Sequence, residues 1–181
     1  MEQTIKVSDR YFKHYLSAEQ IQQKVKAVAA RINRDLADKH PLFVVVLNGA
    51  FVFAADLFRN ITIQDAEITS LRMKSYVGTQ TTGQVNLISG LCESVAGRNV
   101  VIIEDIVDSG YTMDKLVHQL KDDLNANEVY VCCLLSKPNA LKVKDLKLDY
   151  VAMEIPNDFI VGYGLDYNEK GRNLSDIWVV V

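Results

Sequence analysis

The segment Val100–Met113, VVIIEDIVDSGYTM, determines how the rest of the chain is interpreted. It opens with four β-branched apolar residues, too few for a buried helix, so we predict a buried parallel strand. Two acids, Glu104 and Asp105, follow at the carboxyl end of this strand. The polar loop DSGYT comes next, ahead of a helical pattern of apolar residues. The segment therefore predicts a strand, an acidic edge, a short loop and a helix.

This polar loop has the chemistry of a phosphate-binding site. The first amides of a helix lack intrahelical partners and carry partial positive charge. Ser109 and Thr112 add hydroxyl donors, and Gly110 allows a tight turn. The two preceding acids would repel phosphate, so we expect them to accept hydrogen bonds from the hydroxyls of a neighbouring ribose. These residues predict a ribose-5-phosphate site, against the alternative of an ordinary strand-to-helix turn with solvated acids.

The order of residues in this segment resembles the phosphoribosyl pyrophosphate (PRPP) loop of type I phosphoribosyltransferases. The pattern is an apolar strand, two acids, two apolar residues, Asp, Ser, Gly, a variable residue (Tyr111) and Thr. The hypoxanthine-guanine branch is the most similar, over most of the chain. The resemblance implies reversible transfer of 5-phosphoribosyl from PRPP to N9 of hypoxanthine or guanine, giving IMP or GMP and pyrophosphate. Mg²⁺ is the implied cofactor.

The resemblance also implies roles for the acids of the segment. Asp108 matches the general acid/base at purine N7, and residues 108–112, Tyr111 included, match the phosphate contacts. Glu104 and Asp105 match residues that hold the ribose and the magnesium ion. Because magnesium is a hard cation, carboxylate oxygens are suitable ligands for it.

A second apolar strand, at 43–47, ends in Asn48-Gly49-Ala50 ahead of an apolar helix that reaches Phe58. In the resembling family the matching turn usually carries a basic residue before Gly, and a strained peptide presents N–H groups to pyrophosphate. Asn48 departs from this pattern, so the charge is lost while the backbone contribution can remain. The alternative is a plain turn between strand and helix.

The segment 77–84 is polar and contains glycine, without helix or strand periodicity. It is either a lid or an ordinary hairpin loop. The resembling family has a flexible loop with a leading Ser-Tyr pair, which Ser75 and Tyr76 match. The resemblance implies that this loop closes over the reaction and excludes water.

The carboxyl-terminal third of the chain contains the expected purine site. Lys137 follows an apolar strand at 129–135, and alone it would be interpreted as a surface lysine. The resemblance implies that Lys137 meets the 6-oxo group, Phe159 stacks on the base and the backbone of Ile160 meets the base edge. It implies that Asp166 of the same purine-binding segment is a magnesium ligand and that Arg172 contacts pyrophosphate. Without the resemblance, we would interpret Phe159 as a core residue and Asp166 as an acid in a turn.

The alternation of apolar strands and helices predicts a doubly wound, mainly parallel α/β sheet flanked by helices, in one domain over residues 1–181. We expect a small hood from the N-terminal residues and the residues after Lys137. Further elements are expected at 66–76 and 150–155 as strands and at 17–39 as a helix, which Ser17 and Gln20 begin as a capping box.

Composition narrows the class of protein. A net charge of −3 gives no basic footprint for nucleic acid, and no segment has the pattern of a signal peptide or a membrane span. We expect a cytoplasmic homo-oligomer, a dimer or tetramer, with Cys92, Cys132 and Cys133 as buried thiols. Two alternatives stay open: a phosphoribosyltransferase that prefers xanthine or another base, and an RNA-binding regulator of the same fold.

Overall fold

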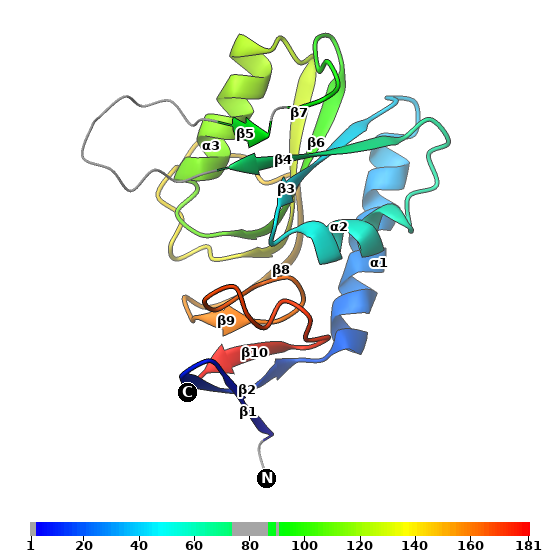
Figure 1. The fold of residues 1–181 in the computed structure, drawn as a ribbon. Helices are drawn as coiled ribbons and strands as arrows, with labels where there is room; N and C mark the ends of the chain where they lie inside the picture. The colour runs from blue at the N-terminus through cyan, green and yellow to red at the C-terminus, as the bar shows by residue number, and fades with distance from the viewer. Residues whose placement is uncertain (1–2, 74–86, 90) are drawn as a thin grey trace, which may run out of the picture.

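The computed structural model describes residues 3–73, 87–89 and 91–181, which form two sheets (Figure 1). The larger sheet has the order β5-β4-β3-β6-β7-β8 and the smaller one the order β1-β2-β10-β9. The strands of the larger sheet are β3 (Leu42–Leu47), β4 (Glu67–Met73), β5 (Leu87–Ser89), β6 (Asn99–Val107), β7 (Glu128–Ser136) and β8 (Tyr150–Glu154). Those of the smaller sheet are β1 (Thr4–Val7), β2 (Arg10–Leu16), β9 (Ile160–Val161) and β10 (Ile177–Val180).

The larger sheet is parallel except at β5, which pairs with β4 in the antiparallel sense. Leu47 lies opposite Arg72, and Val107 lies opposite Ser136, so β3, β4, β6 and β7 end at the same edge. Loops that follow parallel strands at such an edge are where open α/β sheets bind ligands. The predicted doubly wound α/β sheet is confirmed, and its edge brings the expected site segments together.

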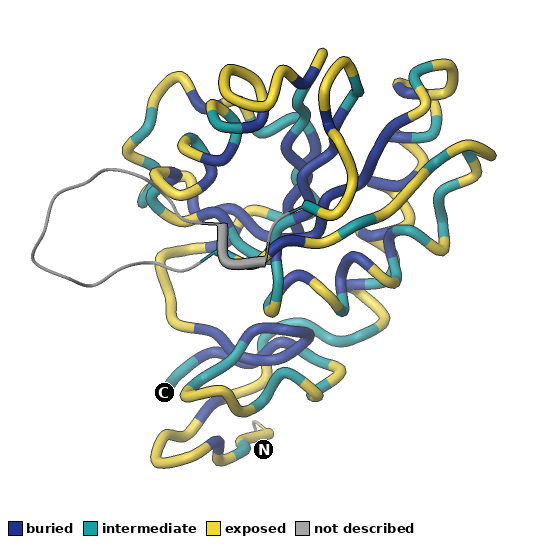
Figure 2. Tube along the Cα trace, turned by 45° about the horizontal axis from the view of Figure 1, so that its top comes forward, coloured by how far each residue is buried: buried dark blue, intermediate teal, exposed yellow. Residues whose placement is uncertain are grey.

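Helices cover both faces of this sheet, which explains why its central strands are apolar without alternation. Along β3, Phe43 and Val45 belong to the core formed with α1 (Ala18–Asp35) and α2 (Phe51–Phe58). Val44 and Val46 belong to the opposite core, formed with α3 (Tyr111–His118) and a following π-helical turn, η1 (Gln119–Asp123). Figure 2 shows these central strands among the buried segments of the molecule.

Helix α1 begins as its sequence predicts. The Ser17 side chain accepts a hydrogen bond from the Gln20 amide at 3.2 Å, and the Gln20 side chain accepts one from the Ser17 amide at 3.0 Å. This capping box satisfies amides at the helix start that would otherwise lack a partner. The helix ends at Asp35, earlier than the predicted Lys39.

The smaller sheet, β1-β2-β10-β9, is the hood, and it lies against the end of the larger sheet (Figure 1). The prediction that all residues after Lys137 join the hood is wrong, because β8 pairs with β7 in the larger sheet. Hood residues Ile160 and Ile177 share one apolar cluster with Ile21 of α1. The hood is therefore anchored by burial, and also by a hydrogen bond from the Tyr163 hydroxyl to Asp56 of α2 at 2.7 Å.

The structure corrects two further expectations. Strand β6 continues to Val107, so Glu104 and Asp105 lie inside its last residues rather than after them. Cys92 is exposed, because it lies in the irregular connection before β6, whereas Cys132 and Cys133 are buried in β7 as expected. Among the described helices, none has the length and apolar character that crossing a bilayer requires.

Candidate active site

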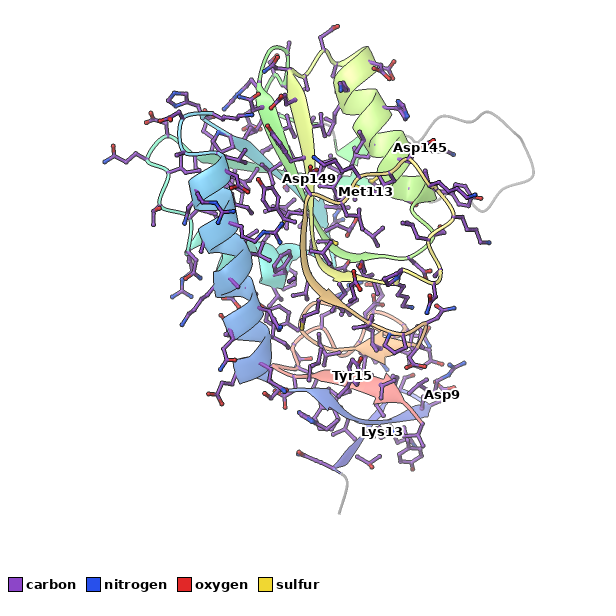
Figure 3. The ribbon with its side chains drawn as sticks, turned by 180° about the vertical axis from the view of Figure 1, so that it is seen from behind. Asp9, Lys13, Tyr15, Met113, Asp145 and Asp149 are labelled. Atoms are coloured by element: carbon purple, nitrogen blue, oxygen red, sulfur yellow. The ribbon has the colours of Figure 1, made fainter. Side chains whose placement is uncertain are left out.

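The loop between β6 and α3 surrounds a cavity of about 240 Å³. Its lining includes Met113, labelled in Figure 3, and residues 104–110 and Thr112. Gly110 has a φ of 85°, and a Cβ at this position would lie 2.8 Å from the Leu141 side chain. The tight turn predicted at Gly110 therefore exists, and its positive φ strains any other residue there. The Tyr111 side chain is exposed and lies outside this lining, which leaves its backbone as the part that can meet phosphate.

The two acids of β6 lie between this loop and the turn after β3. A Cβ at Gly49 would lie 1.7 Å from Asp105 Oδ2, so the Asp105 carboxylate rests directly against the Gly49 backbone. Burial, and then the charge of Asp105, raise the pKa of Glu104 well above its ordinary range. Asp105 is thus directed toward the neighbouring turn, and its expected contact with ribose stays a prediction.

The turn after β3 contains a cis peptide bond between Leu47 and Asn48. The Asn48 side chain accepts a hydrogen bond from Arg72 Nη2 at 2.9 Å. Within the described ranges, the Gly49 amide has no hydrogen-bond partner. Its expected contact with pyrophosphate stays a prediction.

Lys137 and Asp108 bring the expected purine and phosphate sites into contact. Lys137 Nζ lies 3.6 Å from Asp108 Oδ2, and the Lys137 amide donates to the Val107 carbonyl at 3.0 Å. Lys137 is 9% exposed, so it is not the surface lysine that its residue type alone would suggest. A charge held in this way at a ligand-binding edge is suited to a specific polar contact.

The hood loop after β9 packs on the turn that holds Gly49. A Cβ at Gly164 would lie 2.2 Å from the Gly49 carbonyl oxygen, and Gly164 has a φ of 100°. Arg172 donates to the Gly164 carbonyl at 2.8 Å and pairs with Asp166 Oδ1 at 2.7 Å. Asp166 and Arg172 are thereby carried to the edge that contains the β6 acids.

The expected metal ligands do not form one cluster. In the part of the chain that the structure describes, no group of three His, Cys, Asp or Glu side chains is placed to hold an ion. The Asp166 carboxylate is taken up by Arg172 and by the Glu169 amide. Glu104 and Asp105 are adjacent, and their mutual repulsion makes them the members of the set that best fit a hard cation.

Phe159 is 41% exposed, while Ile160 next to it is buried in β9. The Phe159 ring contacts Phe12 and Tyr167, with centroid distances of 6.3 and 5.7 Å, and these three rings form the hood aromatic cluster. The cluster supports one side of Phe159 and leaves part of the ring accessible, as an aromatic that stacks on a base requires.

Two hood residues that sequence reasoning missed support this cluster. The Arg10 guanidinium lies 5.0 Å from the Tyr167 centroid and 6.0 Å from that of Phe159. A hydrogen bond from Tyr167 lowers the pKa of Asp9, which Figure 3 labels in the hood. No sequence motif marks Asp9 or Arg10, because they meet Phe159 and Tyr167 only in the folded chain.

A larger hollow, of about 550 Å³, lies beside α3 and contains none of the expected site residues. Asp145 and Asp149, both labelled in Figure 3, line it together with Lys121 and Lys147. Its charges are mixed and partly paired with each other, as in Lys147 with Asp149. We therefore place the site at the smaller cavity.

Ser75, Tyr76 and the segment 77–84, which were expected to form a lid, lie outside the described residues.

The chain belongs to the phosphoribosyltransferase family. The family model for the phosphoribosyl transferase domain matches residues 13–168, which include the β6 loop, Lys137 and Phe159.

Individual relatives indicate a narrower class of enzyme than the family model does. A hypoxanthine-guanine phosphoribosyltransferase of Bacillus subtilis is 42% identical over 166 residues, which are 91% of each chain. A solved hypoxanthine-guanine phosphoribosyltransferase of Bacillus anthracis is 42% identical with a TM-score of 0.84, covering 93% of this chain and 96% of that one. A hypoxanthine phosphoribosyltransferase of Staphylococcus aureus is 36% identical with a TM-score of 0.85, covering 93% and 90% of the two chains.

Proposed function

We propose that this protein is a purine-salvage enzyme that transfers 5-phosphoribosyl from PRPP to N9 of hypoxanthine or guanine. The products are IMP or GMP and pyrophosphate. The observation that carries the proposal is the contact between Lys137 and Asp108, 3.6 Å apart, which joins a buried base-recognising cation to the phosphate loop. The identity of 42% with the Bacillus subtilis enzyme supports the choice of bases.

The phosphate loop holds the 5-phosphate in this proposal. The amides at the start of α3 and the hydroxyls of Ser109 and Thr112 donate to the phosphate oxygens. The cavity of about 240 Å³ provides the space, and Gly110 keeps the loop tight around it. Glu104 and Asp105 accept from the ribose hydroxyls, which fixes C1 while its bond to pyrophosphate lengthens.

Positive charge develops on the ribose as pyrophosphate leaves, and the nearby carboxylates stabilise it. Lys137 donates to the purine 6-oxo group, Phe159 stacks on the ring, and the Ile160 backbone meets the base edge. Asp108 exchanges a proton with purine N7, and proton transfer of this type contributes about 10²–10⁴-fold.

Magnesium is part of the proposal. A bound magnesium ion would neutralise charge on the leaving pyrophosphate. Glu104, Asp105 and Asp166 would hold it. Arg172 and the Gly49 amide would then face pyrophosphate. A cytoplasmic location, a homo-oligomeric state and a single working domain over residues 1–181 stay predictions.

Product formation from PRPP tests the function. The purified protein is given PRPP, magnesium and one of hypoxanthine, guanine, xanthine or adenine, and nucleotide is measured by chromatography. We expect IMP and GMP and little product from adenine. Preferred use of xanthine would indicate the other enzyme class, and absence of any nucleotide, together with RNA binding, would indicate the regulator.

A further inference from the structure

Arg72 and Asn48 link the ends of two neighbouring parallel strands. Leu47, the last residue of β3, lies opposite Arg72 in β4. Arg72 Nη2 donates to Asn48 Oδ1 at 2.9 Å. Arg72 is exposed, so this hydrogen bond holds a solvent-accessible guanidinium at the ligand-binding edge of the sheet, beside the turn formed by Asn48 and Gly49.

The turn needs a positive charge if it binds pyrophosphate. The Asp105 carboxylate rests against Gly49, and Glu104 adjoins it, so the surroundings of the turn are acidic. Like charges disfavour each other strongly where water is partly excluded. Asn48 carries no charge, although the turn of the resembling family usually has a base at this position.

In the described part of the chain, Arg72 lies at this edge without a counter-charge. Lys137 pairs with Asp108, and Arg172 pairs with Asp166. Arg72 makes no ion pair with any residue that the structure describes. A guanidinium has five N–H donors in a planar fork, so the bond to Asn48 leaves others free for phosphate oxygens.

We propose that Arg72 binds the pyrophosphate group of PRPP, with the Asn48 side chain as the acceptor that orients its guanidinium. Arg72 thus supplies, from the adjacent strand, the charge that the turn itself lacks. This inference rests on the proposed PRPP-dependent function. It assigns to β4 a part in substrate binding, and it gives a reason for the neutral residue at position 48.

Arg72→Gln tests the proposal, because it removes the charge and keeps an amide donor that can reach Asn48. Pyrophosphate binding is measured by calorimetry in the presence of magnesium, and KM is measured separately for PRPP and hypoxanthine. We expect pyrophosphate and PRPP to bind about 10- to 100-fold more weakly, as for the loss of a hydrogen bond to a charged group. The KM for hypoxanthine and the Tm are expected to change little, whereas a merely structural link would lower the Tm and leave pyrophosphate affinity intact.

Arg98→Gln is the matched control. Arg98 is a partly exposed arginine that pairs with Glu67 at the opposite end of β4, with 2.6 Å between Nη2 and Oε1. We expect wild-type pyrophosphate affinity in this variant. Equal weakening in the two variants would overturn the proposal, because it would show that the effect follows net charge rather than the position of Arg72.

Two further variants test the mechanism. Asn48→Ala keeps the charge and frees the guanidinium, so a smaller loss of about two- to fivefold is expected, in line with one neutral hydrogen bond. Asn48→Lys combined with Arg72→Gln returns a base to the turn and is expected to recover most of the pyrophosphate affinity. A double variant that binds no better than Arg72→Gln would refute the role of charge.

Wild-type turnover separates this proposal from the proposed function. If the wild type forms no IMP from PRPP and hypoxanthine, the proposed function fails. If the wild type is active and Arg72→Gln binds pyrophosphate as the wild type does, only the role of Arg72 fails.

Discussion

Asp108 and Lys137 directly follow the ends of neighbouring strands, and Lys137 Nζ lies 3.6 Å from Asp108 Oδ2. Lys137 is almost fully buried, while the Asp108 side chain is 57% exposed. The pair therefore consists of a fixed cation and an accessible carboxylate. In the proposed reaction, a purine that enters this site receives a hydrogen bond from Lys137 and exchanges a proton with Asp108.

The first prediction concerns Asp108. Asp108→Asn keeps the shape of the side chain but removes proton transfer, so kcat should fall by about 10²–10⁴-fold. PRPP affinity should change much less, because the phosphate loop remains. Steady-state kinetics and PRPP binding check this, with Asp122→Asn on η1 as a control that we expect to behave as the wild type. An unchanged kcat in Asp108→Asn would refute the assignment.

The second prediction concerns the choice of base. Lysine offers donors and no acceptor, so Lys137 suits a 6-oxo group and opposes the amino group of adenine. A buried donor left unpaired costs about 1–3 kcal/mol, and sites built on such contacts can discriminate by about 10⁴-fold. Lys137→Gln should lose most activity with hypoxanthine and guanine and narrow the gap to adenine. kcat/KM for the three bases is the measurement, and Lys144→Gln, an exposed lysine nearby, is the control. Intact hypoxanthine kinetics in Lys137→Gln would place the selector elsewhere.

The third prediction concerns Arg10, which lies over Phe159 and Tyr167. Exposed cation–π contacts contribute about 0.5–1 kcal/mol, so Arg10→Ala should raise the KM for hypoxanthine about two- to fivefold. kcat and the KM for PRPP should change less, because in the proposed reaction the rings that Arg10 contacts lie at the base site. Lys6→Ala removes a similar contact, 5.5 Å from the Tyr11 centroid, and serves as the control. Equal effects of the two substitutions would count against a specific role of Arg10.

The fourth prediction concerns the stability cost of Glu104. Burial, and then Asp105, raise its pKa above the ordinary value of 4.5, so the folded chain binds this proton more tightly than the unfolded chain. Stability is therefore lost as pH rises from 4.5 toward the folded pKa. Glu104→Gln should raise the Tm of the metal-free protein at about pH 8. It should have little effect at about pH 4, where Glu104 of the folded chain is protonated and, like glutamine, uncharged.

Thermal unfolding across this pH range, in the presence of a chelator, measures the effect of Glu104. Glu93→Gln, at an exposed acid, is the control. A gain in Tm of the same size at both pH values would show that packing, rather than ionisation, is responsible.

Much of the fold followed from local signals in the sequence. The β-branched run at the start of Val100–Met113 predicted a buried strand, because only a strand covered on both faces uses such a pattern. Ser17 and Gln20 predicted the start of α1, because a capping box involves atoms within one helical turn. Gly110 predicted a tight turn, and its φ of 85° agrees. The family resemblance added the residues whose types alone were uninformative, such as Lys137.

The tertiary structure decided the relationships between segments that are distant in the chain. The contact of Gly49 with Asp105, the packing of Gly164 on Gly49 and the bond from Arg72 to Asn48 each join two such segments. Local propensity carries no information about these distances, because they depend on strand order and on how closely two backbones approach. The sequence by itself thus determined the candidate groups at the strand ends, whereas only the fold decided that the Arg72 guanidinium lies beside Asn48.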